Sequence, residues 1–183
     1  MVDPTRRSAA RTATLVAVPV TLVVLFGSLL FYGGLGDGDP QPAATGPVTM
    51  ATRDLGAEAT GICQAVIANL PDEVLGHARR PVSAGTEQNA AYGDPAITVE
   101  CGATMPTFSP TDTSDVIIHD GVCWHPVAGD DSAAWTTVNR IVAVTVTVPG
   151  TDGSGEIASA FSVVIRDNDP ERAAEELPTG CVG

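Results

Sequence analysis

The chain has 183 residues, with 22 acidic and 9 basic side chains and a formal net charge of −13 at pH 7. All nine basic residues are arginines; three of them precede residue 13, so six arginines stand against 21 acids after residue 35. Such a surface repels nucleic acid and anionic headgroups, which argues against nucleic-acid binding. The length leaves room for one domain after the N-terminal quarter.

Residues 13–35, ATLVAVPVTLVVLFGSLLFYGGL, contain no charged side chain. A helix of this length rises about 33 Å, enough to cross a hydrocarbon core of about 30 Å. Arg6, Arg7 and Arg11 before it predict a cytoplasmic N-terminus, residues 1–12, and an extracytoplasmic remainder. We expect an uncleaved single-pass signal anchor in the cell membrane. A cleaved signal peptide is the alternative, with weak cleavage sites near Ala43 and Ala44.

Residues 36–53, rich in Gly, Pro and Asp at their start, are expected to be a flexible linker, followed by an extracytoplasmic domain at 54–183. All four cysteines lie in this domain, at positions 63, 101, 123 and 181. An even number of cysteines in an oxidising compartment predicts two disulfides, and three connectivities are open. The chain has no CxxC pair, so a thioredoxin-like redox role is not supported.

The predicted elements begin with a helix over Ala57–Leu70, whose apolar residues share one face and which Pro71 ends. A loop containing Arg79 and Arg80 leads to a strand at Ile97–Cys101. Asp120-Gly121 predicts a two-residue hairpin turn. The β-branched run Trp135–Pro149 predicts one long strand, and an amphipathic helix is expected from Ile157 to about Asp167.

Asp169-Pro170 is a candidate cap for a short final helix. Strands between helices indicate an α+β domain with an antiparallel sheet and two or three helices on one face.

The stretch HDGVCWH, residues 119–125, resembles a metal-binding sequence. A two-residue turn places His119 opposite Val122 and Ile118 opposite Cys123, so Cys123 and His125 point to one side and His119 to the other. A transition-metal site needs three or four converging ligands, and Cys123 is expected in a disulfide. We therefore predict no metal and no cofactor.

No sequence motif of the common hydrolases occurs, and we predict no catalytic residue. Arg79 and Arg80 are adjacent cations in an acidic domain, which suits them to clamp an anion, although neutralisation of nearby acids is the simpler interpretation. Our hypothesis is that Asp94, in the turn Gly93-Asp94-Pro95, holds at least one guanidinium in a bidentate pair. Together with Arg140 and Tyr92, these residues are the predicted ligand or partner contact.

Several motifs occur in a familiar order: C-x6-LP with RRP behind it, AAYGDPAITVECG, GVCW, WTTVNR and VTVTVP. In this order they resemble the actinobacterial membrane-protein family called domain of unknown function 3515, over about residues 63–149. The resemblance implies an N-terminal anchor and one extracytoplasmic domain, but no activity. Positions that match the pattern are Cys63, Leu70, Pro71, Arg79, Arg80, Gly93, Asp94, Pro95, Cys101, Gly102, Gly121, Trp124, Thr137 and Arg140. Tyr92 departs from it, because a tryptophan is expected there.

The resemblance matches the family's usual cysteines to Cys63 and Cys101, with Cys123 and Cys181 as additions. We predict bridges Cys63–Cys101, joining the first helix to its strand, and Cys123–Cys181, joining the C-terminal tail to the hairpin.

We expect a non-enzymatic, membrane-anchored module that acts through contacts with an envelope protein partner. The alternative is a protein or enzyme that binds a small ligand or an envelope polymer through the region of Arg79, Arg80 and Arg140.

Overall fold

A computed structural model describes residues 46–107, 116–150, 152–173, 177, 180 and 181. The predicted cytoplasmic segment (1–12) and membrane span (13–35) lie outside these residues. Among the described helices, none has the length and apolar character that a membrane span requires.

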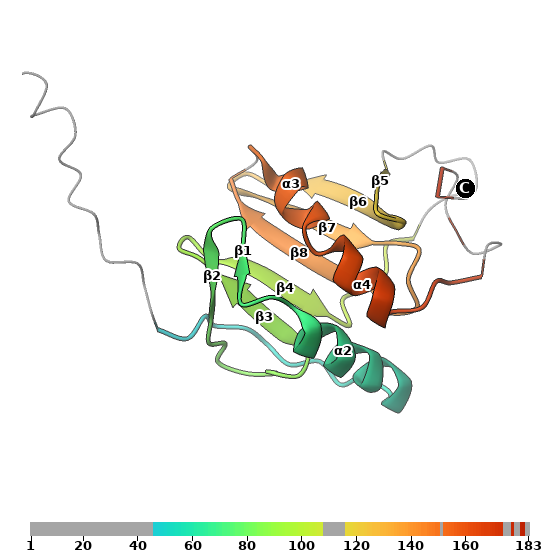
Figure 1. Ribbon diagram of the computed structural model, residues 1–183, viewed down its shortest axis with the longest axis horizontal. Helices are drawn as coiled ribbons and strands as arrows, with labels where there is room; N and C mark the ends of the chain where they lie inside the picture. The colour runs from blue at the N-terminus through green and yellow to red at the C-terminus, as the bar shows by residue number, and fades with distance from the viewer. Residues whose placement is uncertain (1–45, 108–115, 151, 174–176, 178–179, 182–183) are drawn as a thin grey trace, which may run out of the picture. The chain divides into compact units, whose positions relative to one another are not determined.

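The described residues form an antiparallel sheet of eight strands and three helices. The helices are α2 (Ala57–Asn69), α3 (Ser154–Ser159) and α4 (Ser162–Asn168). The strands are β1 (Glu73–Val74), β2 (His77–Arg80), β3 (Asn89–Tyr92), β4 (Ile97–Cys101), β5 (Ile117–His119), β6 (Val122–Ala128), β7 (Ser132–Thr137) and β8 (Val144–Pro149). Their order in the sheet is β1-β2-β3-β4-β8-β7-β6-β5, and all three helices cover the same face of it (Figure 1). The predicted α+β class is confirmed.

Helix α2 follows its prediction to within one residue at its C-terminal end. Its buried residues, Cys63, Val66 and Ile67, recur at the spacing of one helix face. Leu70 is extended, with φ −64° and ψ 140°, as expected for a residue that precedes proline. Its last turn contains no basic residue, so the final carbonyls need donors from elsewhere in the chain.

The prediction of one strand over Trp135–Pro149 is wrong. The run folds into a hairpin of β7 and β8, in which Trp135 pairs with Val146. Between the strands, the side chain of Asn139 accepts a hydrogen bond from Cys123 N–H at 2.8 Å. The hydroxyl of Thr137 accepts one from Val144 N–H at 3.0 Å. These side-chain contacts hold a turn that β-branched residues conceal in the sequence.

Two further predictions need correction. The helix expected over Ile157–Asp167 is divided into α3 and α4, and Phe161, at the break, is fully buried. After Asp169-Pro170, residues 171–173 form no helix; Glu171 pairs with Arg140 in an isolated bridge instead. The rest of the expected final helix lies partly outside the described residues.

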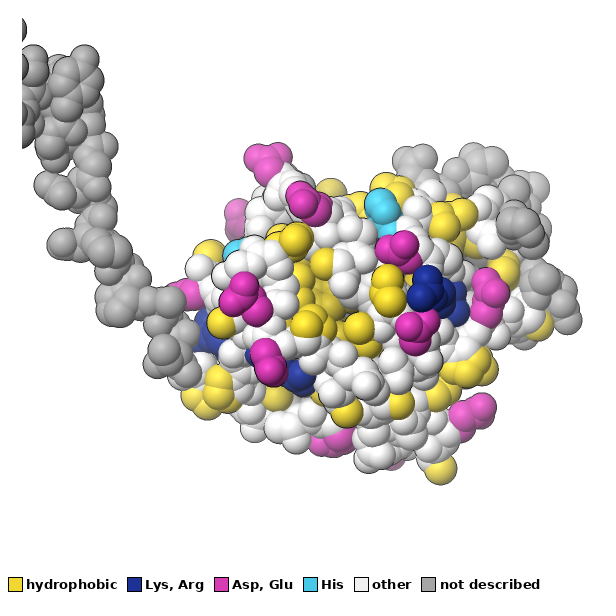
Figure 2. All heavy atoms as spheres, viewed as in Figure 1, with side chains coloured by type: hydrophobic (Ala, Val, Ile, Leu, Met, Phe, Trp, Pro, Cys, Tyr) yellow, Lys and Arg dark blue, Asp and Glu magenta, His cyan; other side chains and the backbone are white. Residues whose placement is uncertain are grey.

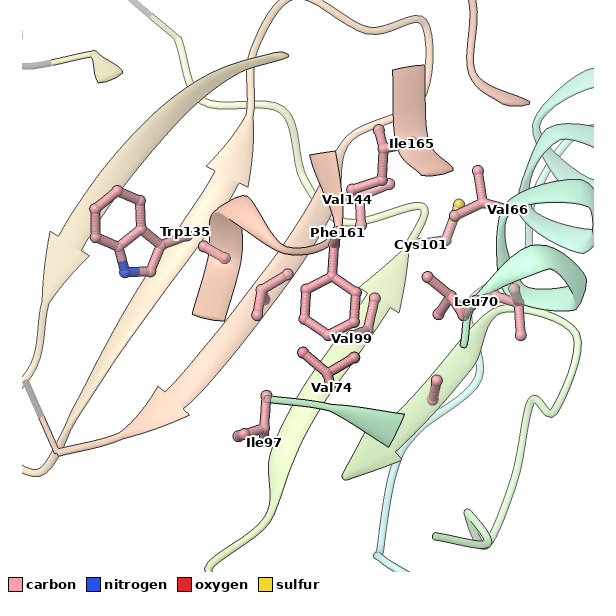
Figure 3. Close-up of a cluster of buried hydrophobic side chains, with 14 of the residues drawn as sticks. Val66, Leu70, Val74, Ile97, Val99, Cys101, Trp135, Val144, Phe161 and Ile165 are labelled. Atoms are coloured by element: carbon pink, nitrogen blue, oxygen red, sulfur yellow. The ribbon is translucent and has the colours of Figure 1, made fainter. Parts of the chain in front are cut away.

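The main core lies between the sheet and the helices. Alternate residues of β8 (Val144, Val146 and Val148) are buried on this side, because successive side chains of a strand point to opposite faces. Figure 3 shows Val144 between Ile165 and Phe161, with Val99 beside the Phe161 ring and Val66 of α2 farther to the right. A second, smaller cluster contains Cys123, Val138 and Cys181.

Both predicted disulfides are present. Cys63 of α2 bonds to Cys101 of β4, with their Cα atoms 5.5 Å apart. Cys123 of β6 bonds to Cys181, with their Cα atoms 5.9 Å apart. The first bridge lies in the main core and the second in the smaller cluster, so each fastens a different part of the domain.

Residues 46–53, which composition assigns to the linker, run along the domain. Val48 forms a parallel bridge with Val82, and its N–H donates to Pro81 O at 2.8 Å. The amide of Gln88 binds both backbone groups of Arg53, and Asn89 donates to Ala51 O at 2.8 Å.

Candidate functional site

Arg79 stabilises the C-terminal end of α2. Its guanidinium donates to Leu70 O at 3.2 Å and to Ile67 O at 3.1 Å. These carbonyls carry the negative end of the helix dipole, where a cation is favourable. Strand β2, not α2 itself, therefore supplies the missing donors. The role of the Arg79 guanidinium is structural.

Arg80 points to the opposite face of the sheet, because it is the next residue of the same strand. It donates to Gly93 O at 2.8 Å and to Gly46 O at 2.9 Å. Its Nη1 atom lies 3.8 Å from Asp94 Oδ1, so the hypothesised partner is Arg80, but at ion-pair rather than hydrogen-bond distance. A pair of this kind at the surface contributes about 0–1 kcal/mol.

Tyr92 is a core residue. Its side chain is fully buried, its ring centroid lies 5.5 Å from that of Phe161, and its hydroxyl donates to Pro71 O at 2.9 Å. Burial raises the pKa of Tyr92 to about 12, although the nearby Arg79 charge lowers it. The hydroxyl therefore stays protonated and ties β3 to the end of α2, away from any ligand at the surface.

Arg140 lies in the β7–β8 connection, at the other end of β4 from Asp94, because Cys101 pairs with Val144. It is 5 % exposed and donates to Asp169 O at 3.3 Å and to Gly121 O. Burial lowers the pKa of its guanidinium, and the charge of Glu171 opposes that shift. The three arginines therefore do not converge on Asp94.

Asp169, at the end of α4, is a buried carboxylate that sequence reasoning treated only as a helix cap. It has no exposed surface, and its Oδ1 accepts from Val142 N–H at 3.3 Å. Burial raises the pKa of Asp169 to about 7 against the effect of its hydrogen bonds and of Arg140. Arg140 binds the Asp169 backbone carbonyl, which explains why its charge compensates the carboxylate only in part.

The residues of HDGVCWH adopt the predicted hairpin register, with His119 opposite Val122, Ile118 opposite Cys123 and Ile117 opposite Trp124. Cys123 is in a disulfide, and Trp124 is fully buried with its Nε1 donating to Ser162 Oγ at 2.9 Å. In the described part of the chain, no three His, Cys, Asp or Glu side chains are grouped closely enough to hold a metal ion.

One cleft among the described residues has a volume of about 420 Å³ and is lined by residues 49–53, Thr98 and Glu100. Arg53 and Glu100 form an ion pair within it. Another cleft, of about 170 Å³, also borders Arg53. Neither cleft is lined by Arg79, Arg80, Arg140 or Asp94, so the predicted contact residues do not form a pocket there.

Two tight turns of the sheet have similar φ angles at both central positions but differ in the first central residue. In the β5–β6 turn, Asp120 and Gly121 have φ angles of 50° and 80°. In the β1–β2 turn, Leu75 and Gly76 have φ angles of 47° and 84°. Positive φ at both central positions defines a type I′ turn, for which Asn-Gly and Asp-Gly are preferred.

Leucine is a poor residue for this turn. A left-handed conformation costs an L-residue about 1–2 kcal/mol, and only glycine, asparagine and aspartate adopt it readily. Leu75 is also 53 % exposed, so its side chain gains little from burial. The turn was not predicted from the sequence because Leu-Gly is not a typical turn pair. The one indication of a turn was Gly76, between Val74 and the polar residues 77–80.

A family model described as protein of unknown function (DUF3515) matches residues 14–174. No curated protein and no solved structure matches the chain.

Proposed function

The chain belongs to the DUF3515 family of proteins of unknown function, and we propose that its folded domain is a non-enzymatic binding module of the cell envelope. In this proposal residues 13–35 anchor the protein in the membrane and the domain contacts a protein partner outside the cytoplasm. The family match leaves the activity open, so the proposal depends on the residues of the domain.

The observation that carries the proposal is the use of the polar residues inside the fold. Arg79, Arg80 and Arg140 donate to backbone carbonyls, and the Tyr92 hydroxyl is buried. A catalytic or ligand site requires polar groups that converge on a cavity. The polar groups with the most specific contacts here converge on the backbone, which is typical of a rigid scaffold.

The outer surface supports binding of a protein. On the face shown in Figure 2, acidic side chains surround a central group of hydrophobic ones. The six arginines that follow residue 35 are far fewer than the 21 acidic residues there, so the charge of the domain stays strongly negative. Exposed large hydrophobic residues also occur on several elements: Leu75, Ile117, Ile118, Val127, Ile141 and Val163. Two disulfides make the module rigid and suit it to an oxidising compartment.

The proposal is tested by purifying the full-length protein from detergent-solubilised membranes after cross-linking and quantifying the associated proteins by mass spectrometry. The control is the same chain without residues 46–183, which keeps the predicted anchor. A partner recovered only with the full chain supports the proposal. Equal recovery by both chains, or a tightly bound small molecule in native mass spectrometry, contradicts it. A mature form recovered from the medium and starting near Thr45 overturns the anchor.

A further inference from the structure

We propose that the β1–β2 turn is a docking surface for a cationic protein partner, with Leu75 as the apolar anchor and Asp72 and Glu73 as the charged flank. This inference rests on the proposed function and names the surface and the kind of partner.

Leu75 has a backbone conformation that is unfavourable for leucine, so the stability of the fold does not explain why leucine occupies this position. The same chain places aspartate at the equivalent position of the β5–β6 turn, where the φ angle differs by only 3° (50° against 47°). Aspartate or asparagine at position 75 would be compatible with the same turn at a lower conformational cost. A residue that is unfavourable for the backbone and half exposed to water contributes to something other than stability, and strained backbone is found most often at binding sites.

The turn is held rigidly, as a docking element requires. Val74, directly before Leu75, is 4 % exposed and belongs to the main core. Arg79 N–H donates to Asp72 O at 2.7 Å, and the Arg79 side chain fastens β2 to α2. On the far side of the turn, Gly93 lies so close to His77 that a Cβ atom there would come within 2.5 Å of its ring. Leu75 is thus presented on a fixed support, which lowers the entropy lost on binding.

The charge around the turn defines the partner. Asp72 and Glu73 are both exposed, and both arginines of β2 donate to backbone carbonyls. An apolar side chain flanked by carboxylates fits an apolar pocket rimmed by lysine or arginine. A second copy of this chain does not fit, because two such turns would bring their carboxylates together.

The test uses the full chain in cells, with a photoreactive amino acid at Ala78, the exposed residue that pairs with Glu73. Leu75 is kept in one version and replaced in the other (Leu75→Asn). A third version carries Asp72→Asn and Glu73→Gln. The control site for the photoreactive residue is Val127, which is as exposed as Leu75 but belongs to β6. Thermal unfolding of each version is measured beside cross-linking.

We expect position 78 to yield a cross-linked protein that is absent from position 127. The yield should fall about tenfold with Leu75→Asn. The double charge variant and 0.5 M salt should also lower the yield. The Tm of the Leu75→Asn version should be unchanged or higher, which separates lost binding from lost folding.

Equal cross-linking with leucine and asparagine, a lower Tm for Leu75→Asn, or a cross-linked homodimer overturns the docking surface. If a partner instead cross-links at position 127, this surface is wrong while the proposed binding function stands. If neither position yields a partner, this surface is wrong, and the purification from membranes decides whether the proposed binding function also fails.

Discussion

Leu75 and Asp120 occupy equivalent positions in two type I′ turns of one sheet, with φ angles of 47° and 50°. Each is followed by a glycine with positive φ, and both turns join adjacent antiparallel strands, β1–β2 and β5–β6. The pair is an internal comparison, because the φ angles are similar and the residue differs. The comparison separates the residue preference of the turn from any further role of the Leu75 side chain.

Exchanging the residue types should change stability in opposite directions. Leu75→Asn is expected to raise the free energy of unfolding by about 1 kcal/mol, because asparagine tolerates a left-handed conformation. Asp120→Leu is expected to lower it by about 1–2 kcal/mol for the same reason. Urea unfolding of the two variants and the parent protein checks this. Destabilisation by Leu75→Asn would show that the leucine side chain makes a contact that the fold needs.

Arg79 is expected to contribute strongly to the stability of the domain. Arg79→Leu leaves the carbonyls of Ile67 and Leu70 without their charged donor and should destabilise the domain by about 2–3 kcal/mol. Arg79→Lys should recover only part of this, because an ammonium group does not reproduce the fork of donors. The matched control is Arg53→Leu, which removes an ion pair of a 44 % exposed side chain and should cost at most about 1 kcal/mol. Equal losses for the two leucine variants would contradict the proposed role of Arg79.

The contributions of the two disulfides to stability should be separable by experiment. They span sequence separations of 38 and 58 residues, for which the chain-entropy relation gives about 4 kcal/mol each. Replacing Cys63 and Cys101 by alanine disturbs the main core, whereas replacing Cys123 and Cys181 disturbs only the smaller cluster with Val138. Limited proteolysis should therefore release the C-terminal tail first in the second variant, with the rest of the domain intact. Non-reducing peptide mapping that joins Cys63 to Cys123 would disprove the pairing.

Elements defined by local residue patterns were predictable from the sequence. Apolar spacing and Pro71 gave the bounds of α2, and Asp120-Gly121 gave the register of the β5–β6 hairpin. The run Trp135–Pro149 was misassigned because its turn depends on Asn139, whose partner Cys123 is 16 residues away. The roles of Arg79 and Arg140 were equally out of reach, since their acceptors are carbonyls of other elements.

Asp169 should make the stability of the domain depend on pH. Burial raises the pKa of its carboxyl from 3.8 to about 7 in the folded state. Between these two values the folded protein binds a proton that the unfolded chain has lost, so the free energy of unfolding should fall as the pH rises. The stabilising contribution of the protonated form is complete below about pH 4 and lost above about pH 7.

Arg140 is the charged group that acts on this carboxyl, beside the backbone N–H groups of Val142 and Ile141. The net effect of a shift of this size is a few kcal/mol. Other carboxylates add their own pH dependence, so the informative quantity is the difference between the parent protein and Asp169→Asn. Asparagine keeps an oxygen to accept from Val142 N–H and carries no charge.

Urea unfolding from pH 4 to pH 8 should show Asp169→Asn gaining stability over the parent as the pH rises, with the gain levelling off near pH 8. Asp130→Asn, at an exposed position, is the control and should show no such gain. A constant difference between Asp169→Asn and the parent across this range would show that Asp169 is already ionised in the folded protein at pH 4.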